Sequence, residues 1–364
     1  MQVAIVVPCL NEEATLANTC ASLGFGSGAR STSADTVIVL VDNGSTDQTR
    51  AVMAAVRDHS APGSVILSSE AERGFVPPRH RGVLEARAFA QRRGLTEPDV
   101  LLLQADADTI YLDGYVDAMR VASLDAGAGF LVEAVTEPPP DFSRDHAGYV
   151  ALSDEVDRMV AHLNVDEADD VVVDDKAAGF RLSDYFLWGG LRREFGLHGD
   201  EIYAETTRLF IRGKAHHAQK RHVVGAVAHP SRRKLFGNPA LFFATAGFPR
   251  EESWNDQWRS GYGGPTLIEA FEGSKDRAEI AKAVVVRQAH SVILFGLLPL
   301  LVADIAEIRA AEQPARRALH QLLALVPRTG LSLDEPGRLL TSVLALIDLH
   351  PEAIQRAIDS SCTV

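Results

Sequence analysis

The sequence contains few cysteines. Its 364 residues include three, Cys9, Cys20 and Cys362, and their spacing forms neither a CxxC pair nor a set of metal ligands. A disulfide framework or a structural metal site is therefore not expected, and a sparse, odd set of cysteines suits the reducing cytosol. A chain of this length buries enough apolar surface to fold without such cross-links.

The sequence also lacks an excess of basic residues. Its 36 lysines and arginines are outnumbered by 49 aspartates and glutamates, which gives a formal net charge of −13 at pH 7. A nucleic-acid-binding protein needs a basic face that displaces counterions from the phosphates. Nucleic acid is therefore not an expected partner, whereas a local basic pocket for one small phosphate group is compatible with this charge.

No apolar run is long enough to cross a membrane. The longest, at 292–303, has 12 residues and includes Gly296 and Pro299, whereas a membrane-spanning helix needs about 20. Its apolar residues are continuous rather than confined to one face, so a buried core or a dimer contact is expected instead of a membrane-surface helix. The N-terminus lacks the features of a signal peptide, so a cytoplasmic location is expected.

Strand and helix patterns alternate through the first 135 residues. The predicted strands are 3–7, 36–41, 64–68, 100–104 and 129–135, and the predicted helices are 11–23, 46–58, 83–93 and 111–124. Continuous apolar strands separated by helices predict an α/β fold with a mostly parallel sheet and helices on both faces.

The pattern changes after residue 136. The acidic stretch 166–175 is interpreted as a solvated loop rather than a metal site, because it lacks the glycine and spacing of a calcium loop. Residues 182–250 are expected to be irregular. Further helices are predicted at 265–273, 276–294, 302–325 and 333–359.

These patterns predict two regions. We expect one large domain at 1–250, divided at residue 135 into two halves, and a C-terminal helical region at 265–364. A homodimer contact, or a cover over part of the site, is a candidate role for the helical region.

Three polar clusters directly follow predicted strands, at 8–13, 42–47 and 106–109. The carboxyl ends of parallel strands lie at one edge of a sheet, and ligands bind beyond that edge. Clusters this far apart in the sequence are therefore expected to meet at one site.

The third cluster contains Asp106 and Asp108, whose i, i+2 spacing lets both carboxylates turn toward one cation. Oxygen ligands suit Mg²⁺ or Mn²⁺. A cation held by one or two carboxylates has open positions for phosphates and neutralises the charge on a departing diphosphate. A DxD triplet alone is a weak signal, and its position beside two other strand-end clusters is what favours a metal site.

Three motifs occur in an order typical of a known family. Residues 6–13 read VVPCLNEE, residues 39–49 read VLVDNGSTDQT and residues 106–108 read DAD. Together they resemble the family 2 glycosyltransferases, which use a nucleotide-sugar-binding GT-A fold. The resemblance covers residues 1–135, extends more weakly over 136–250 and does not reach the C-terminal helices.

The resemblance implies an activity. A sugar would pass from a nucleoside-diphosphate sugar, with a UDP-sugar favoured over a GDP-sugar, to the hydroxyl of an acceptor that the sequence does not identify. The transfer would be metal-assisted, with Mn²⁺ or Mg²⁺ as cofactor, and would invert the anomeric carbon.

The resemblance also implies roles for the first two motifs. Pro8, Asn11 and Glu12 would shape the nucleotide-binding loop, while Asp42 and Asn43 would present acceptors to the base or ribose. Many relatives carry a second aspartate at the position of Asn43, and an amide keeps an acceptor but loses the charge.

Two basic segments also match the family. Residues 78–82, PRHRG, look like its Ala-Arg-Asn-x-Gly element, so Arg79 is expected to approach the nucleotide sugar near the DxD. Residues 227–234, VAHPSRRK, are similar to a segment in which some relatives have a third metal ligand, which makes His229 a candidate. Arg232 and Arg233 are candidates for binding phosphate or an acidic acceptor. The alternative for each is an ordinary surface or loop residue.

The acceptor side departs from the family. Relatives often carry Glu-Asp at a helix start, and that aspartate deprotonates the acceptor hydroxyl. The nearest match, GDEIYAETTRL at 199–209, places Glu205 in the first position and Thr206 in the second, so the expected base is missing. Glu205, Asp200 and Glu201 are the candidate bases, and a charged helix face is the alternative for each.

Two other functions stay open. A nucleotidyltransferase on a related sheet would have a glycine-rich basic loop after the first strand, where this chain has CLNE at 9–12. A non-catalytic protein that binds nucleotide sugars is compatible with the altered base position. Release of nucleoside diphosphate with and without Mn²⁺ separates this second alternative from an enzyme.

Overall fold

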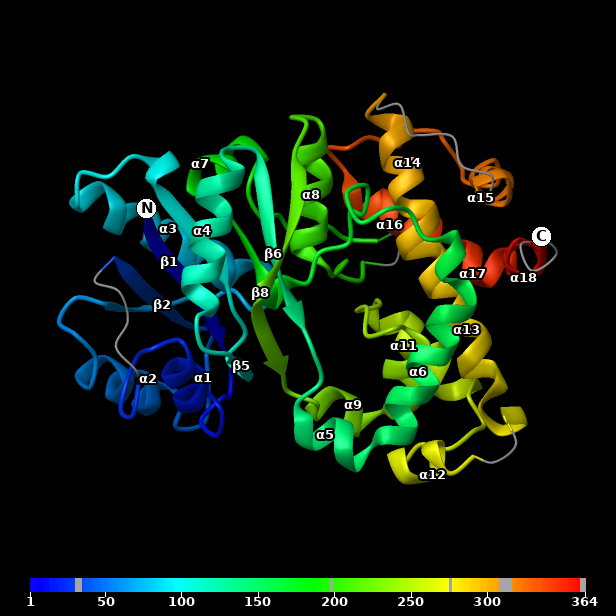
Figure 1. Ribbon diagram of the computed structural model, residues 1–364, viewed down its shortest axis with the longest axis horizontal. Coiled ribbons are helices and arrows are strands. Elements are labelled where there is room, and N and C mark those ends of the chain that lie inside the picture. The colour runs from blue at the N-terminus through cyan, green and yellow to red at the C-terminus, as the bar shows by residue number, and fades with distance from the viewer. Residues whose placement is uncertain (30–34, 197–198, 275–276, 308–315, 361–364) are drawn as a thin grey trace. The chain divides into compact units, whose positions relative to one another are not determined.

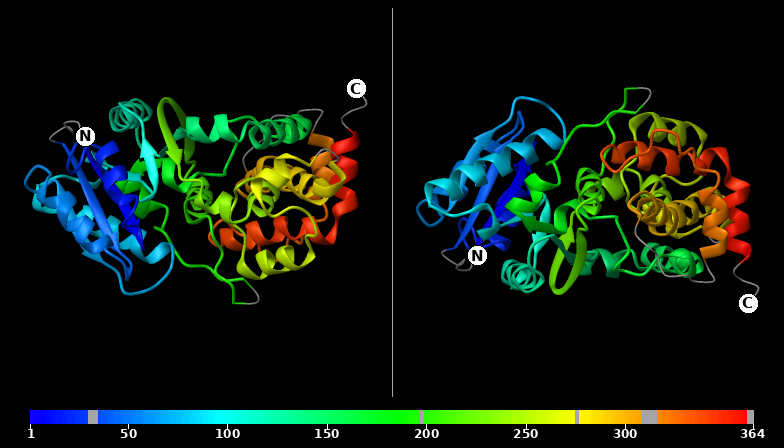
Figure 2. Two further views of the ribbon diagram at one scale, coloured as in Figure 1. Left: turned by 90° about the horizontal axis from the view of Figure 1, so that it is seen from below. Right: turned by 90° about the horizontal axis from the view of Figure 1, so that it is seen from above.

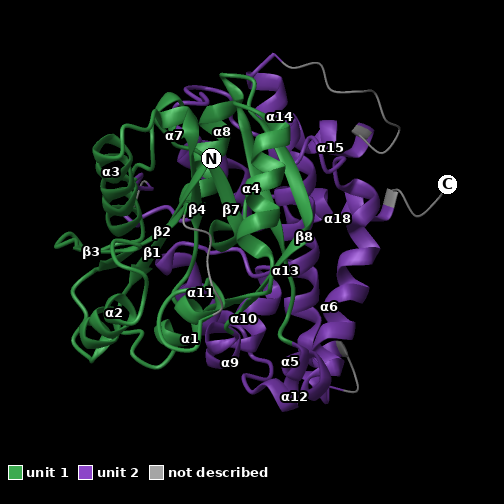
Figure 3. Ribbon diagram, turned by 60° about the vertical axis from the view of Figure 1, so that its left-hand side comes forward, with its two compact units in different colours: residues 1–139, 173–193, 205–231 green, residues 140–172, 194–204, 232–364 purple. Residues whose placement is uncertain are grey.

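The computed structural model describes residues 1–29, 35–196, 199–274, 277–307 and 316–360. The chain divides into two compact units, shown in different colours in Figure 3. Unit 1 comprises residues 1–139, 173–193 and 205–231, and unit 2 comprises residues 140–172, 194–204 and 232–364. Cys9 and Cys20 are buried and form no disulfide, and Cys362 lies outside the described residues.

Unit 1 is built on an eight-stranded sheet with the order β3-β2-β1-β4-β7-β6-β8-β5 (Figure 1). The strands are β1 (Gln2–Cys9), β2 (Thr36–Asp42), β3 (Val65–Ser69), β4 (Val100–Gln104), β5 (Thr109–Tyr111), β6 (Phe130–Thr136), β7 (Ala178–Arg181) and β8 (Gln219–Pro230). Strands β3, β2, β1 and β4 are parallel, as are β6 and β8, whereas β7 and β5 run antiparallel to their neighbours. The predicted mostly parallel α/β sheet is confirmed.

Helices cover both faces of this sheet. They are α1 (Leu16–Ser22), α2 (Thr49–Asp58), α3 (Val76–Arg92), α4 (Tyr115–Ala126), α7 (Leu182–Leu187) and α8 (Glu205–Lys214). Strands β1 and β2 pair in parallel and lie side by side in Figure 1, and Figure 2 shows the chain from two further sides. Both are apolar along almost their whole length because each of their faces packs against helices.

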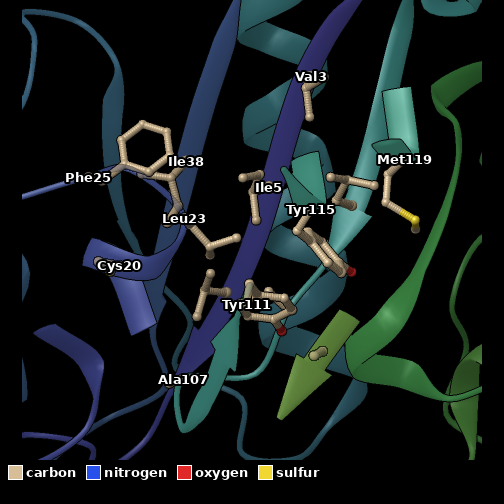
Figure 4. Close-up of a cluster of buried hydrophobic side chains, with 14 of the residues drawn as sticks. Val3, Ile5, Cys20, Leu23, Phe25, Ile38, Ala107, Tyr111, Tyr115 and Met119 are labelled. Carbon is tan, nitrogen blue, oxygen red and sulfur yellow. The ribbon is translucent and has the colours of Figure 1, made fainter. Parts of the chain in front are cut away.

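The core on one face is formed by alternate residues of the strands. Val3 and Ile5 of β1 pack with Cys20 of α1 and with Tyr115 and Met119 of α4 (Figure 4). The intervening β1 residues point to the opposite face, toward α3. Side chains that alternate in direction along a strand explain why one apolar strand serves two cores.

A glycine sets the distance between α3 and the sheet. A Cβ atom at Gly82 would lie 2.3 Å from Cγ1 of Val6 and 3.3 Å from Cγ2 of Val41. Helix α3 therefore approaches β1 and β2 more closely than a larger residue would permit. This close contact fixes the helix that carries Arg79.

The predicted helix boundaries at the site need correction. The predicted helix 11–23 begins only at Leu16, because Asn11 has a φ of 56° and residues 11–15 form a loop. Helix α3 begins at Val76 rather than at residue 83, because Pro77 and Pro78 fit its first turn instead of breaking it. The predicted helix 111–124 begins at Tyr115, after β5.

The prediction that residues 182–250 are irregular is wrong. This region contains α7, α8, β8, α9 (Arg233–Gly237) and α10 (Pro239–Ala244). All ten residues of α8 are buried, including charged ones, so its pattern is not that of a surface helix. Strand β8 has a register shift opposite Ala134 and Val135 of β6, which disrupts its alternation.

Unit 2 is helical. Besides α9 and α10 it contains α5 (Pro140–Asp145), α6 (Ala147–Val160), α11 (Glu252–Gly261), α12 (Ile268–Glu272), α13 (Ala281–Val292), α14 (Leu298–Ile305), α15 (Arg316–Leu323), α16 (Pro336–Leu344), α17 (Leu346–Leu349) and α18 (Pro351–Ser360). The predicted helical character of the C-terminal region is thus confirmed. The helix predicted at 302–325 is wrong as a single helix, because α14 ends at Ile305, and part of it, 308–315, lies outside the described residues. The single helix predicted at 333–359 is three helices, the last of which starts at Pro351.

One helical stretch of unit 2 is long and apolar. Ala278–Ile305 has 28 residues and a mean hydropathy of 1.7 in its most apolar window, and 78% of that window is buried. This helical stretch is longer than the apolar run at 292–303, because neither Gly296 nor Pro299 ends the helix. Gly296 lies within a π-helical segment, and Pro299 fits the first turn of α14. A buried core helix meets the same criteria of length and composition as a membrane span, and the burial agrees with the predicted core contact.

Candidate active site

The loops after β1 and β2 are joined by hydrogen bonds. The register places Cys9 opposite Asp42. Oδ1 of Asn11 accepts a hydrogen bond from the backbone N–H of Thr46 at 2.9 Å, and the backbone N–H of Glu12 donates to Oγ1 of Thr49 at 2.7 Å. The structure therefore brings the first two motifs together, as their positions after parallel strands predicted.

Asp42 lies at the centre of the second loop. Its carboxylate accepts hydrogen bonds from the backbone N–H groups of Gly44 at 3.3 Å and Ser45 at 3.0 Å, and from Nε of Arg50 at 2.7 Å. Burial opposes ionisation, but the hydrogen bonds from Ser45 and Arg50 outweigh it and lower the pKa of Asp42. Asp42 is therefore an anion that stabilises its own loop.

Asn43 is buried and holds a neighbouring loop. Its Nδ2 donates to the backbone carbonyls of Glu70 at 3.0 Å and Glu72 at 2.7 Å, and its Oδ1 accepts from the backbone N–H of Gly74 at 3.4 Å. A carboxylate has no N–H to donate to two carbonyls. This explains why an amide stands where many relatives have an aspartate; contacts of Asp42 and Asn43 with a base or ribose stay predictions.

Arg79 joins three segments of unit 1. It is buried, and it donates from Nε to Oε1 of Glu205 at 3.0 Å, from Nη1 to Oε1 of Gln104 at 3.1 Å and from Nη2 to Oδ1 of Asp106 at 2.5 Å. Burial would lower the pKa of Arg79, but the neighbouring Asp106 and Glu205 carboxylates raise it. The cluster therefore contains a permanently charged guanidinium next to the DxD triplet.

Asp106 is also held through its backbone. Val6 lies opposite Gln104 in the parallel pair of β1 and β4, so the turn after β4 is at the same edge of the sheet as the first two loops. The backbone N–H of Asp106 donates to the hydroxyl of Tyr111 at 3.1 Å, and this hydroxyl donates to the carbonyl of Lys176 at 3.0 Å. The three predicted clusters thus lie at one edge.

The antiparallel pair of β5 and β8 brings a second segment to the triplet. His229 lies opposite Ile110, and the backbone N–H of Ser231 donates to the carbonyl of Asp108 at 3.1 Å. Within the described ranges, no group of three or more His, Cys, Asp and Glu side chains is arranged to hold a metal ion. A cation at Asp106 and Asp108 would therefore need oxygen ligands from a bound molecule.

Asp175 belongs to the same cluster, although the sequence did not single it out. It begins a 3₁₀ turn, Asp175–Ala177, and its Oδ1 accepts a hydrogen bond from the backbone N–H of Thr206 at 3.0 Å. Burial and the nearby Glu205 carboxylate raise the pKa of Asp175 to about 7, against the opposite effect of Arg79.

The interpretation of 166–175 as a solvated loop therefore needs correction at its end. Residues 166–169 are exposed, as predicted, but Asp175 packs within unit 1. The apolar residues at 171–173 and 177–180 on either side of Asp174 and Asp175 are the signal that could have indicated a buried acidic pair.

Four predicted site residues belong to unit 2. These are Asp200, Glu201, Arg232 and Arg233. The guanidinium of Arg232 lies 5.3 Å from the ring centroid of Phe142 in the same unit, a cation–π distance. The roles of these four residues stay predictions.

Unit 1 has a mostly parallel α/β sheet with polar loops at its carboxyl edge, as the expected GT-A fold requires. Residues 4–120 match the sequence model of the family described as Glycosyl transferase family 2. The resemblance to family 2 glycosyltransferases is thereby confirmed, and it supports sugar transfer as the general activity. A search of curated proteins finds no match to the chain.

Solved structures with similar folds include three glycosyltransferases. TarS 1–349 of S. aureus in complex with UDP-GlcNAc has 13% identity and a TM-score of 0.43, with 96% of this chain and 92% of that chain covered. The mannosyltransferase PcManGT from Pyrobaculum calidifontis in complex with GDP-Man and Mn²⁺ has 16% identity and a TM-score of 0.46, with 97% and 86% covered. Glucosyl-3-phosphoglycerate synthase from Mycobacterium tuberculosis in complex with Mg²⁺ and UDP has 17% identity and a TM-score of 0.38, with 68% and 80% covered.

Proposed function

We propose that the protein transfers a sugar from a nucleoside-diphosphate sugar to an acceptor hydroxyl, with help from Mn²⁺ or Mg²⁺ and with inversion of the anomeric carbon. The observation that carries this proposal is the ion pair of Arg79 with Asp106, at the sheet edge where the loops after β1 and β2 interlock. The positive charge of Arg79 suits a diphosphate, and the negative charge of Asp106 suits a cation.

The proposed donor site spans the three loops. Pro8, Asn11 and Glu12, with Asp42 and Asn43, would surround the base and ribose. A UDP-sugar is proposed in preference to a GDP-sugar, on the basis of the family resemblance. The diphosphate would lie toward Asp106, where Arg79 supplies a fixed positive charge.

The side chains present at the proposed metal site suit a divalent cation. Asp106 and Asp108 offer carboxylate oxygens, which suit Mg²⁺ and Mn²⁺. The pairing of β8 with β5 brings the strand of His229 alongside Asp108. His229 is proposed to turn toward the cation only when the cation binds, because the described residues show no preformed group of three ligands. A small site of this kind is completed by phosphate oxygens, as is common for Mg²⁺. When bound, the cation would neutralise charge on the departing diphosphate.

The residues proposed for the acceptor side follow from the family resemblance. Arg232 and Arg233 are proposed to bind phosphate or an acidic acceptor. Of the carboxylates predicted as the base, Asp200 and Glu201 are in unit 2, and Glu205 is in unit 1. The charge of Glu205 is already matched by Arg79, to which it bonds at 3.0 Å.

Three general features complete the proposal. The domain is proposed to extend over 1–250, with its donor half at 1–135 and its acceptor half at 136–250. The helical region at 265–364 is proposed to form a homodimer contact, and the protein is proposed to act in the cytoplasm.

The proposal is tested by measuring nucleoside diphosphate release. The wild-type protein is incubated with UDP-glucose, UDP-GlcNAc or GDP-mannose, with Mn²⁺ or with EDTA. We expect release from at least one donor with Mn²⁺ only. Asp106→Asn and Asp108→Asn should each slow it by about 10²–10³-fold, because charge stabilisation on the leaving group is lost.

Asp117→Asn is the matched control for these two variants. Asp117 is an exposed aspartate of α4, paired with Arg120 at 2.5 Å, so its loss should leave release unchanged. Mn²⁺-dependent nucleotide binding without any release would favour the non-catalytic alternative. Unchanged turnover in both Asp106→Asn and Asp108→Asn would reject the assignment of the site.

A further inference from the structure

A carboxylate from a distant segment contacts the position where the catalytic aspartate is missing. Thr206 stands in that position, and its backbone N–H donates to Oδ1 of Asp175 at 3.0 Å, across 31 residues of sequence. Both residues belong to unit 1. Asp175 therefore brings a carboxylate to the start of α8 without being part of that helix.

The surroundings of Asp175 distinguish it from Glu205. Glu205 is 4% exposed and forms an ion pair with Arg79, whereas Asp175 is a half-buried residue. Asp175 accepts an N–H from the first turn of the ten-residue helix α8, and this end of a helix favours an anion. A carboxylate that is held in a fixed orientation is suited to taking a proton from a substrate hydroxyl.

We propose that Asp175 is the general base of the transfer reaction, in place of the aspartate that is absent at Thr206. This inference rests on the proposed function. Asp175 takes the proton of the acceptor hydroxyl while the acceptor oxygen forms a bond to the anomeric carbon of the donor. The bond from that carbon to the diphosphate oxygen breaks, and its electron pair leaves with the nucleoside diphosphate. The proton remains on Asp175.

The charges around Asp175 give the reaction a pH dependence. Arg79 from α3, Glu205 from α8, Asp106 from the turn after β4, and Asp174 and Lys176 on its own segment are the charged groups near it. Burial and the Glu205 carboxylate raise the pKa of Asp175 to about 7. A base works in its ionised form, so the rate should rise with pH through about 7 and then level off.

The same charges explain the threonine at position 206. Arg79 already pairs with the carboxylates of Asp106 and Glu205, and its charge also acts on the nearby carboxylate of Asp175. A further carboxylate at the buried position of Thr206 would be repelled by Asp175 and Glu205. One base is therefore expected, supplied either by position 175 or by position 206.

The test replaces Asp175 and then moves the carboxylate. Asp175→Asn keeps an oxygen for the N–H of Thr206 and removes a charge from an acidic cluster, so the fold should persist. With the donor that the wild type turns over, and with water as the acceptor, release of nucleoside diphosphate should fall by about 10²–10⁴-fold. The affinity for UDP in Mn²⁺ should stay within a few-fold, and the rise of the rate through about pH 7 should disappear.

Rescue separates a base from a merely structural residue. The double variant Asp175→Asn/Thr206→Asp places the carboxylate at the family position without adding to the negative charge of the cluster. Its rate should be at least tenfold higher than that of Asp175→Asn. Asp175→Glu, which keeps the carboxylate, should be more active than Asp175→Asn.

Two control variants test whether a neighbouring carboxyl group, rather than Asp175, causes the pH dependence of the rate. Asp174→Asn changes the adjacent acid, which pairs with Lys176 at 2.5 Å. Glu133→Gln removes a second buried carboxyl, whose pKa burial raises to about 7 against the effect of Lys220. Both should keep the pH profile of the wild type.

The outcomes are distinct for the two proposals. If the wild type releases no nucleoside diphosphate from any donor, the proposed function fails. If the wild type is active but Asp175→Asn keeps both its rate and its pH profile, only the role of Asp175 is overturned. Loss of the pH profile in Glu133→Gln would overturn it as well.

Discussion

Two polar clusters of unit 1 place carboxylates in opposite surroundings. Around Asp42, one carboxylate accepts hydrogen bonds from two backbone N–H groups and from Arg50, and the pKa of Asp42 is lowered. Around Arg79, one guanidinium pairs with the carboxylates of Asp106 and Glu205, a third carboxylate, that of Asp175, lies nearby, and the pKa of Asp175 is raised to about 7.

The difference separates a structural anion from reactive ones. A carboxylate that accepts several hydrogen bonds stays ionised and holds its loop in place. A cluster with more carboxylates than cations gains by taking up a proton or a metal ion. The cluster around Asp42 is therefore expected to hold its loop in place, and the acid-rich cluster around Arg79 is expected to serve the chemistry.

The largest expected effect is that of Arg79→Met. Removing a buried arginine leaves Glu205 and Asp175 without a counter-charge, so the free energy of unfolding should fall by about 3–5 kcal/mol. Without this counter-charge, these two carboxyl groups are more stable in their protonated forms in the folded variant. The loss should therefore be largest above pH 7 and shrink as the pH falls toward 4, as measured by urea unfolding at several pH values.

The sign of this pH dependence tests the acid-rich description. Arg92→Met, at the end of the same helix, is the matched control and should cost little. A pH-independent loss in Arg79→Met would mean that packing, not charge, accounts for its effect.

A smaller effect is expected for Asn43→Asp, which introduces the residue found in many relatives. The variant loses two donated hydrogen bonds and places a carboxylate against the carbonyls of Glu70 and Glu72. The cost should be about 1–3 kcal/mol, and it should decrease at low pH, where the new carboxyl is protonated. Thermal unfolding at pH 7 and pH 4 measures it, and equal stability of variant and wild type at pH 7 would remove the structural role of Asn43.

The smallest effect is expected for Arg50→Met. The side chain of Arg50 is 67% exposed, so its pair with Asp42 should contribute no more than about 1 kcal/mol, less at high salt. Because the folded-state pKa of Asp42 is lowered, its contribution is present above its ordinary pKa of about 3.9 and is lost as the pH falls below that value. In Arg50→Met this acid-induced loss should be smaller, as followed by urea unfolding between pH 5 and pH 2.

Sequence patterns predicted the strands and loops at this edge of the sheet well because their signals are local. Strand β4 lies at Val100–Gln104, as its apolar run predicted, and the loops that follow β1 and β2 meet as their strand ends required. Boundaries near proline were less reliable. Pro77 and Pro78 lie inside α3, because the first turn of a helix has no need of their missing N–H groups.

The acid-rich cluster could not be predicted from the sequence, because its contacts are not local. Arg79 and Glu205 are separated by 126 residues, and Asp175 is separated from Thr206 by 31. Asp175 also ends an acidic stretch whose other members are exposed, so composition indicated a solvated loop. Only the packing of η3 (Asp175–Ala177) against the start of α8 shows that this carboxylate differs from its neighbours.

The central claim is that the cluster around Asp106 binds a diphosphate and a divalent cation together. Calorimetric titration of UDP into the wild-type protein, in Mn²⁺ and in EDTA, tests it most directly. The described residues offer no three-ligand metal group, so cation and diphosphate should each complete the other's site. We predict an affinity for UDP at least tenfold higher in Mn²⁺ than in EDTA; equal affinity in the two conditions would contradict the account.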